Sequence, residues 1–318
     1  MKILITGASG FLGSRLAAYY EKKHTVLGLR RTELDFTDKE QTAESVRAFS
    51  PDVIIHCGAI SDVGACAQNP GLSMSVNVKG TRYLASAAAQ TGARFVFCSS
   101  DQVYFSQPDE AVQPQDASAK SLSDSAAPQA ASRSAQAEFL TPHRETELLA
   151  PLPLYGQHKL LAEQACLEEQ PDSVILRLTW MYDHLTAREL ESGRRNLTVS
   201  LEQALRTGTA LTFSETDHRG VTNVQDVIRQ MEQVWQLPAG IYNYGSSNSM
   251  NMYETARQIL SALGRPELLR KAEGGGLRNL TMNPDKTAAC GIRFPDTADG
   301  VIGFLQKQQP IFSSIIPH

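Results

Sequence analysis

The 318-residue chain has few cysteines and no long hydrophobic run. Its five cysteines are odd in number and form no CxxC or Cys/His cluster, which disfavours a disulfide framework and a metal site and indicates a reducing compartment. No stretch approaches the roughly 18 apolar residues that a membrane helix needs. The opening MKILIT lacks the basic and apolar parts of a secretory leader. We therefore expect a cytoplasmic protein with no membrane segment and no bound metal.

The chain also lacks an excess of charge of either sign. It has 30 Lys and Arg against 34 Asp and Glu, for a formal net charge of −4. Bulk attraction to nucleic acid or to an anionic membrane is therefore disfavoured as its mode of action. Hydrophobic residues make up 42% of the chain, which is enough for a sizeable core.

Short apolar runs alternate with helical patterns through the first 180 residues. Several runs are continuously apolar, as in parallel sheets buried on both faces. This alternation predicts a doubly wound parallel α/β fold, a Rossmann fold, with a smaller α/β lobe for the substrate. The expected strands are Lys2–Thr6, Thr25–Leu29, Val53–Cys57, Arg94–Ser99 and Ser173–Leu178, and the expected helices are Gly13–Lys22, Lys39–Phe49, Met74–Thr91 and Tyr155–Glu169.

One segment interrupts the pattern. Residues 106–138 are mostly Ala, Ser, Gln and Pro and offer little apolar surface to offset the entropy of ordering. We interpret them as a long surface insertion, with a substrate lid as the alternative function. The expected domains are a dinucleotide-binding domain of residues 1–180 and about 221–247, a lobe of about 181–220 and 248–299, and a C-terminal segment of 300–318.

A glycine-rich turn follows the first expected strand. Gly7, Gly10 and Gly13 are spaced three apart, which permits a tight turn and a close approach of the backbone to a diphosphate. The helix that follows offers free N–H groups and a partial positive charge to the same anion. The turn therefore predicts a nicotinamide dinucleotide site, for which the contacts expected here are Gly7, Ser9, Gly10, Phe11, Leu12 and Gly13.

The second expected strand ends in two arginines, Arg30 and Arg31. An acidic residue at this place would accept the ribose 2′-hydroxyl of NAD, whereas arginine suits the 2′-phosphate of NADP. The pair therefore favours NADPH, with NADH as the alternative cofactor. A solvated basic pair at a strand end is the other interpretation.

A hydroxyl, a tyrosine and a lysine follow in the order that carbonyl chemistry needs. Tyr155 and Lys159 are four residues apart and share one helix face. A neighbouring ammonium is expected to lower the pKa of the Tyr155 phenol and make it a better acid–base catalyst. Ser100 ends the run FVFCSS, at the strand edge where such sheets bind ligands, and is the candidate donor to a substrate carbonyl oxygen.

These features resemble the extended short-chain dehydrogenase/reductases, and in particular the dTDP-4-dehydrorhamnose reductase family of sugar-nucleotide-binding reductases. The likeness covers nearly the whole chain. It is carried by TGASGFLG at 6–13, ELDFTD at 33–38, PDVIIHCGA at 51–59, VNVKG at 76–80, CSSDQVY at 98–104, LYGQHKLLAE at 154–163, ILRLTWMYD at 175–183, GIYNYGSSNSMNMYETARQI at 240–259 and LRNLTMNPDK at 277–286.

The resemblance implies a role for each matching position. Ser100, Tyr155 and Lys159 match the catalytic residues, and Tyr155 and Lys159 also contact the cofactor. The further cofactor contacts that it implies are Asp35 and Phe36 beside the adenine, Cys57, Gly58 and Ala59 along the cofactor path, and Asn77 in the next helix. The substrate contacts that it implies are Ser100, Asp101, Val103, Trp180, Asn196 and Arg219, with core packing as the other interpretation of Trp180.

The expected reaction is the NADPH-dependent reduction of a 4-keto-6-deoxy sugar nucleotide, and the expected partner is this substrate. Dehydration is disfavoured because Gln102, which follows Asp101, cannot exchange a proton. A nucleotide-sugar epimerase stays open. So does a non-catalytic regulator that binds the cofactor, since the β-subunit of methionine adenosyltransferase resembles the same family. A homodimer is one option for the assembly, and the sequence leaves the oligomeric state and the nucleotide base open.

Overall fold

The structure, a computed structural model, describes residues 1–106, 139–191 and 193–307. The expected insertion at 106–138 lies outside the described residues except for its first residue, and so does its alternative role as a lid. Residues 308–318 of the expected C-terminal segment also lie outside them.

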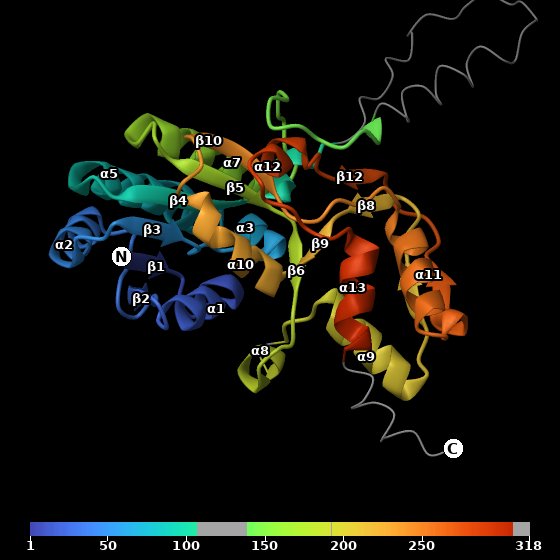
Figure 1. Ribbon diagram of the computed structural model, residues 1–318. Coiled ribbons are helices and arrows are strands. Elements are labelled where there is room, and N and C mark those ends of the chain that lie inside the picture. The colour runs from blue at the N-terminus through green and yellow to red at the C-terminus, as the bar shows by residue number, and fades with distance from the viewer. Residues whose placement is uncertain (107–138, 192, 308–318) are drawn as a thin grey trace, which may run out of the picture.

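The larger part of the molecule is built on one parallel sheet of six strands (Figure 1). The strands lie in the order β10-β5-β4-β3-β1-β2, and every neighbouring pair is parallel. Their bounds are β1 (Lys2–Thr6), β2 (Thr25–Leu29), β3 (Val53–His56), β4 (Arg94–Ser100), β5 (Val174–Leu178) and β10 (Gly240–Tyr244). The expected doubly wound α/β fold is confirmed.

Helices cover both faces of the sheet. Alternate residues of each strand face opposite sides, so that Ile3 and Ile5 pack under α1 and α10 while Leu4 packs under α2, α5 and α7. This two-sided burial explains why the strands are apolar throughout. The helices around the sheet are α1 (Phe11–Tyr20), α2 (Lys39–Phe49), α3 (Val63–Gln68), α4 (Pro70–Ser73), α5 (Thr81–Thr91), α7 (Leu154–Glu169), α10 (Val224–Val234) and α12 (Asp285–Ala289), with the π-helical turn η1 (Met74–Gly80) and the 3-10 turn η2 (Asp101–Tyr104).

The strand order reverses beside β1. The chain leaves β1 toward β2 on one side and then returns to β3 on the other. Loops that leave the sheet in opposite directions open a crevice at the carboxyl ends of the strands, where ligands bind in this class of fold. Gly7 and Cys57, each the first residue after its strand, lie at this switch point.

A smaller lobe lies beside the carboxyl edge of the sheet (Figure 1). Its core joins α9, α11 and α13 through buried residues such as Leu201, Ile259 and Val301. Its elements are β6 (Trp180–Tyr182), α8 (Ala187–Glu191), α9 (Leu197–Thr207), β7 (Leu211–Phe213), β8 (Asp217–Arg219), β9 (Val221–Asn223), α11 (Met252–Ala262), η3 (Pro266–Leu268), β11 (Leu269–Lys271), β12 (Arg278–Leu280) and α13 (Thr297–Gln306).

Two boundaries of the parts differ from the expectation. The segment expected to start at residue 300 begins inside α13, whose Ala298, Val301 and Leu305 belong to the core of the lobe. Helix α12, expected in the lobe, packs against β10 of the sheet, and Ile292 after it joins the core beneath that sheet. The polypeptide therefore crosses between the sheet and the lobe more often than the motifs predicted. Among the described residues, no helix is long and apolar enough to cross a membrane.

Candidate active site

The glycine-rich turn is closely packed. Gly7 has a φ of +69°, and a Cβ there would lie 2.8 Å from the Cα of Gly58. A Cβ on Gly13 would lie 2.4 Å from the carbonyl oxygen of Gly7, so that only glycine lets α1 approach the strand. Helix α1 starts after Gly10, which has no side chain to cap the first N–H groups. The turn therefore presents bare helix N–H groups to the crevice, as a diphosphate site requires.

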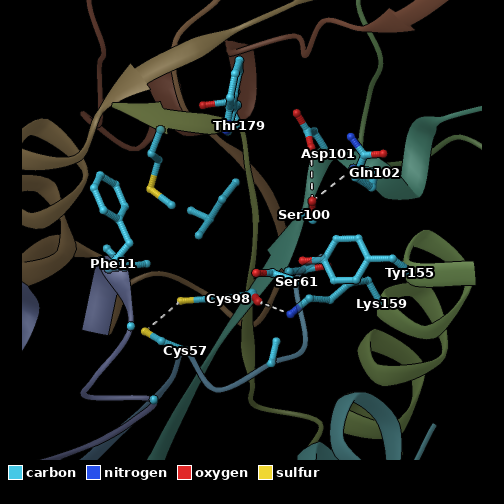
Figure 2. A pocket seen from close by; sticks show the side chains of 18 of the residues that line it. Phe11, Cys57, Ser61, Cys98, Ser100, Asp101, Gln102, Tyr155, Lys159 and Thr179 are labelled. Carbon is cyan, nitrogen blue, oxygen red and sulfur yellow. Dashed lines mark hydrogen bonds between the residues drawn. The ribbon is translucent and has the colours of Figure 1, made fainter. Parts of the chain in front are cut away.

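A cavity of about 430 Å³ opens in front of this turn at the carboxyl ends of β1, β3, β4 and β5 (Figure 2). It is bounded by the turn on one side, by the start of α7 on another and by the lobe on a third. Its lining residues are Gly7, Gly10, Phe11, Leu12, Gly13, Cys57, Ala59, Ser61, Val63, Cys98, Ser99, Ser100, Asp101, Gln102, Tyr155, Lys159, Leu178, Thr179, Trp180, Met181, Arg194, Arg195, Asn196 and Arg219.

Ser100 ends β4 and starts the turn η2. Its hydroxyl oxygen accepts a hydrogen bond from the backbone N–H of Gln102 at 3.2 Å, which caps the turn. The same hydroxyl donates to Oδ1 of Asp101 at 3.1 Å. Ser100 is thus fixed at the cavity wall by the strand on one side and by the turn on the other (Figure 2).

Tyr155 and Lys159 reach the cavity from the first turns of α7. The helix packs directly on η2, because a Cβ on Gly156 would lie only 2.4 Å from the carbonyl oxygen of Gln102. This contact brings the Tyr155 ring beside Ser100 (Figure 2). Lys159 lies deeper and donates from Nζ to the carbonyl oxygen of Cys98 at 2.8 Å. The structure therefore brings together the three residues that the sequence singled out.

The protonation of Tyr155 differs from the expectation. Burial raises the pKa of the Tyr155 phenol well above its ordinary value, and the hydrogen bond with Ser100 opposes this rise. The Lys159 ammonium points toward Cys98 and lies 5.9 Å from the Tyr155 ring centre, so the expected lowering does not occur here. Burial also lowers the pKa of Lys159, against the opposing influence of Cys98 and Cys57. Tyr155 is consequently a proton donor at neutral pH.

A buried polar network stabilises the strand ends behind the site. Glu163, two turns after Tyr155 on α7, accepts a hydrogen bond from Ser99 Oγ at 2.5 Å and pairs with Arg177 of β5 at 2.7 Å. Arg177 also donates to the hydroxyl of Tyr104 at 2.8 Å. The network therefore ties α7, which carries Tyr155, to β5, to η2 and to β4, which ends in Ser100.

The lobe contributes a planar and a cationic group to the cavity wall. Trp180 is 43% exposed and lines the cavity, so it does not serve core packing. The guanidinium carbon of Arg219 lies 5.6 Å from the Trp180 ring centre, and its Nε donates to Asp217 at 3.1 Å. Asn196 lines the same wall, and its side chain also caps α9 by accepting from Val199 N–H at 2.9 Å. An aromatic face beside a cation suits a ring-bearing anion.

Comparison with known proteins shows the family to which the chain belongs. The family model described as the RmlD substrate binding domain matches residues 1–273. The chain belongs to this family.

Three relatives show its range. SpsK, a spore coat polysaccharide biosynthesis protein of Bacillus subtilis (strain 168), is 23% identical over 83% of this chain and 80% of its own length. A dTDP-4-dehydrorhamnose reductase of Mycobacterium tuberculosis is 29% identical over 62% of this chain, a match that spans 55% of that protein. Methionine adenosyltransferase 2 subunit beta of Mus musculus is 27% identical over 83% of this chain and 73% of its own length.

Solved structures share the fold. The structure of dTDP-4-dehydrorhamnose reductase from Bacillus anthracis, a complex with NADP, superposes with a TM-score of 0.74 at 20% identity. The match covers 96% of this chain and 99% of that one. At this identity the likeness shows the fold alone.

Several positions predicted from the RmlD family resemblance lie away from the cavity lining. Val103 is fully buried with Tyr104, Leu280 and Met282, so it packs beneath η2 and does not face the cavity. Asn77 is buried as well and clamps the loop after β3 by donating to the carbonyl oxygen of Ile60 and accepting from its N–H. The side chains of Val103 and Asn77 therefore do not line this cavity, and their predicted contacts with substrate and cofactor stay predictions.

The positions expected around the adenine and the ribose phosphate lie outside the cavity lining. Arg30 and Arg31 are exposed at the end of β2, and Asp35 is exposed after them, where hydrogen bonds from Thr37 lower the pKa of its carboxyl group. The Phe36 ring fills the space that a Cβ on Gly58 or Gly80 would need. Ser9 is exposed within the turn itself.

Other residues of the cavity wall were not predicted from the sequence. The adjacent cations Arg194 and Arg195 border the cavity directly before Asn196, and Ser61 and Thr179 also face it. The run Arg194-Arg195-Asn196 was the available signal, since two cations next to a predicted substrate contact suit an anionic ligand. Among the described residues, no cluster of His, Cys, Asp or Glu could hold a metal ion.

Proposed function

We propose that this chain is an NADPH-dependent reductase of a 4-keto-6-deoxy sugar nucleotide. The observation that carries the proposal is the convergence of Ser100, Tyr155 and Lys159 on one cavity that the glycine turn also borders. The reductases among the relatives support the oxidoreductase class and the sugar nucleotide as its substrate.

The residues fit a nicotinamide dinucleotide. The bare N–H groups after Gly10 would hold its diphosphate, and Gly7 and Gly13 leave room for the close approach. Lys159 would hydrogen-bond the ribose next to the nicotinamide, and the exposed Arg30 and Arg31 would take the 2′-phosphate. When bound, the reduced cofactor supplies the hydride that the protein cannot supply itself.

The chain's own groups handle the proton and the charge. A ketone oxygen placed between Ser100 and Tyr155 would receive a hydrogen bond from Tyr155 and, once the Ser100 hydroxyl proton turns from Asp101 to it, a second one from Ser100. Negative charge that develops on this oxygen would be stabilised. Tyr155 then gives its proton to that oxygen, because the buried phenol keeps its proton at neutral pH. Lys159 lies deeper in the site, where its Nζ donates to the carbonyl oxygen of Cys98.

The sugar nucleotide suits the remaining wall. Arg194, Arg195 and Arg219 offer cations to a diphosphate, and Trp180 offers a flat face to a base or sugar ring. Gln102 follows Asp101, so the acid–base pair that a 4,6-dehydratase would need is incomplete. Reduction is therefore favoured over dehydration.

The experiment follows NADPH absorbance with a panel of dTDP-, UDP- and GDP-linked 4-keto-6-deoxy sugars. We expect turnover with at least one of them and a loss of about 100-fold or more in Tyr155→Phe, in line with the contribution of a general acid. Tyr83→Phe is the matched control, because Tyr83 lies on α5 and outside the cavity lining. Wild-type turnover in Tyr155→Phe would refute the proposed role of that residue.

A regulatory subunit is the second candidate. The similarity to methionine adenosyltransferase 2 subunit beta over 83% of this chain favours it. Tight NADPH binding without turnover of any 4-keto sugar in the panel would support this function in place of the reductase.

A further inference from the structure

Asp101 is the one side chain of the cavity wall with a buried oxygen that lacks a hydrogen-bond partner among the described residues. It is 4% exposed. Oδ1 accepts the hydrogen bond from Ser100 Oγ, whereas Oδ2 has no partner. An unsatisfied carboxylate oxygen is expensive to bury, and a structural role does not explain it.

Other aspartates show what a structural carboxylate does in this protein. Asp38 and Asp62 each accept a backbone N–H at the start of a helix, at 2.9 Å and 2.7 Å. Asp101 does not cap η2, because Ser100 already accepts the N–H of Gln102. Asp101 lines the cavity, and its Oδ2 has no structural partner among the described residues.

The surroundings tune Asp101 to exchange protons near neutral pH. Burial raises the pKa of its carboxyl group to about 6, while Arg219, Ser100 and Gln102 oppose the rise and Asp217 adds to it. A general acid or base is most effective when its pKa lies near the pH at which the enzyme works. Arg219 is held by Asp217 and does not form an ion pair with Asp101 that would keep it ionised.

We propose that Asp101 is a general base that removes a proton from the carbon next to the bound ketone, so that the site also catalyses enolisation. This inference rests on the proposed function, because it needs a ketone between Ser100 and Tyr155. Asp101 follows Ser100 in the sequence and accepts a hydrogen bond from its hydroxyl. A ketone oxygen beside Ser100 therefore brings the neighbouring carbon of the substrate toward Asp101.

The step balances without a further reactant. The C–H bond next to the carbonyl breaks, its proton goes to the carboxylate of Asp101, and its electron pair forms a C=C bond as the carbonyl becomes an enolate. Tyr155 donates to the enolate oxygen, and Ser100 does so once its hydroxyl proton turns from Asp101 Oδ1 to that oxygen. Return of a proton to either face of the same carbon regenerates the ketone, with or without inversion. A carboxylate base beside a tyrosine donor is an arrangement known to support enolisation.

The test measures hydrogen exchange in the absence of a reductant. The full chain is incubated in D₂O with dTDP-4-keto-6-deoxyglucose and NADP⁺, and the sugar is followed by mass and by the loss of proton signals at C3 or C5. We expect enzyme-dependent uptake of deuterium, a fall of about 100-fold or more in Asp101→Asn, and wild-type exchange in the control Asp38→Asn. The wild-type rate should rise with pH through about 6, and this rise should disappear in Asp101→Asn.

The outcomes separate this inference from the proposed function. Reduction by NADPH without exchange by the wild type overturns the role of Asp101 and leaves the reductase intact. Exchange without reduction supports Asp101 and removes the reductase, and the absence of both removes both. Undiminished exchange in Asp101→Asn also overturns the proposal, provided that its unfolding temperature and NADPH binding match the wild type.

Discussion

Glu163 and Arg177 form a buried ion pair that joins the helix of Tyr155 to the strand β5. Their closest atoms lie 2.7 Å apart, and each side chain is 2% exposed. Glu163 accepts two further contacts from the Arg177 Nε at 3.1 and 3.2 Å, and Ser99 donates to it as well. The pair thus satisfies most of its own hydrogen bonds in the interior.

Breaking this pair should strongly destabilise the protein. Glu163→Gln leaves the Arg177 charge buried without its partner, so we expect the free energy of unfolding to fall by about 3–5 kcal/mol. Urea denaturation measures it. Glu168→Gln is the control, because its pair with the half-exposed Arg82 should cost less than about 1 kcal/mol. Equal losses in both variants would contradict the difference in burial.

Gly13→Ala should remove cofactor binding. The new Cβ would meet the carbonyl oxygen of Gly7 at 2.4 Å, so the turn must open or α1 must shift. We expect a loss of stability of about 1–3 kcal/mol and no NADPH binding in a fluorescence titration. Gly71→Ala has open space around its Cβ and should behave as the wild type. Normal NADPH affinity in Gly13→Ala would show that the turn does not hold the diphosphate.

Arg31→Ala should change the choice between cofactors. If its guanidinium meets the 2′-phosphate, the KM for NADPH should rise about tenfold, whereas the KM for NADH should stay near its wild-type value. The side chain is exposed, so stability should change by less than about 0.5 kcal/mol. Arg47→Ala, on the exposed face of α2, is the control. Parallel changes for both cofactors would argue for a solvated basic residue.

His56 should make stability depend on pH. Its Nε2 lies 2.9 Å from Thr81 Oγ1, whose own proton goes to the Asn77 carbonyl, and its Nδ1 lies 2.6 Å from Thr6 Oγ1. In the neutral ring, Nε2 therefore carries the proton and Nδ1 accepts one from Thr6. Burial, with a contribution from the Lys159 charge, lowers the pKa of His56 to about 3.

The direction of the pH effect follows from linkage. Between about pH 6.5 and pH 3 the unfolded chain binds a proton at His56 and the folded chain does not, so the free energy of unfolding falls as the pH falls. Urea denaturation at about pH 7, 5.5 and 4 should show a weaker slope in His56→Gln than in the wild type. An unchanged slope would mean that His56 takes up its proton in the folded state as well.

Local patterns predicted the sheet closely because buried strands and glycine turns are decided by neighbouring residues. β1 and β2 have the expected bounds, and β3, β4 and β5 differ by one residue at one end. The expected helix Met74–Thr91 is interrupted, since Met74–Gly80 is a π-helical turn before α5. Gly80, the last residue of this turn, packs closely against the Phe36 ring. Phe36 is far from Gly80 in the sequence, so no local pattern shows this contact.

The sequence predicted the cavity residues that belong to local motifs. It did not predict the residues that reach the cavity through pairing of strands far apart in the sequence. Ser100, Tyr155 and Lys159 meet because α7 packs on η2 through Gly156, a glycine that no spacing rule identifies. The lobe has strands of three residues whose partners lie about 40 to 60 residues away, such as β11 with β7. Such strands lack a readable period, so the sequence did not show that the lobe brings the loop of Arg194 and Arg195 to the cavity wall.

The chain crosses from the sheet to the lobe as a pair of strands. β6 and β9 run parallel from Trp180 and Val221, and Thr179 and Thr222 join their hydroxyl groups at 2.5 Å. A single linker can swivel about one bond, whereas two hydrogen-bonded strands must bend together. We therefore expect the opening of the cavity to be set when the protein folds and to change little when ligands enter. Selectivity among substrates would then evolve by exchange of side chains such as Trp180, with the frame left in place.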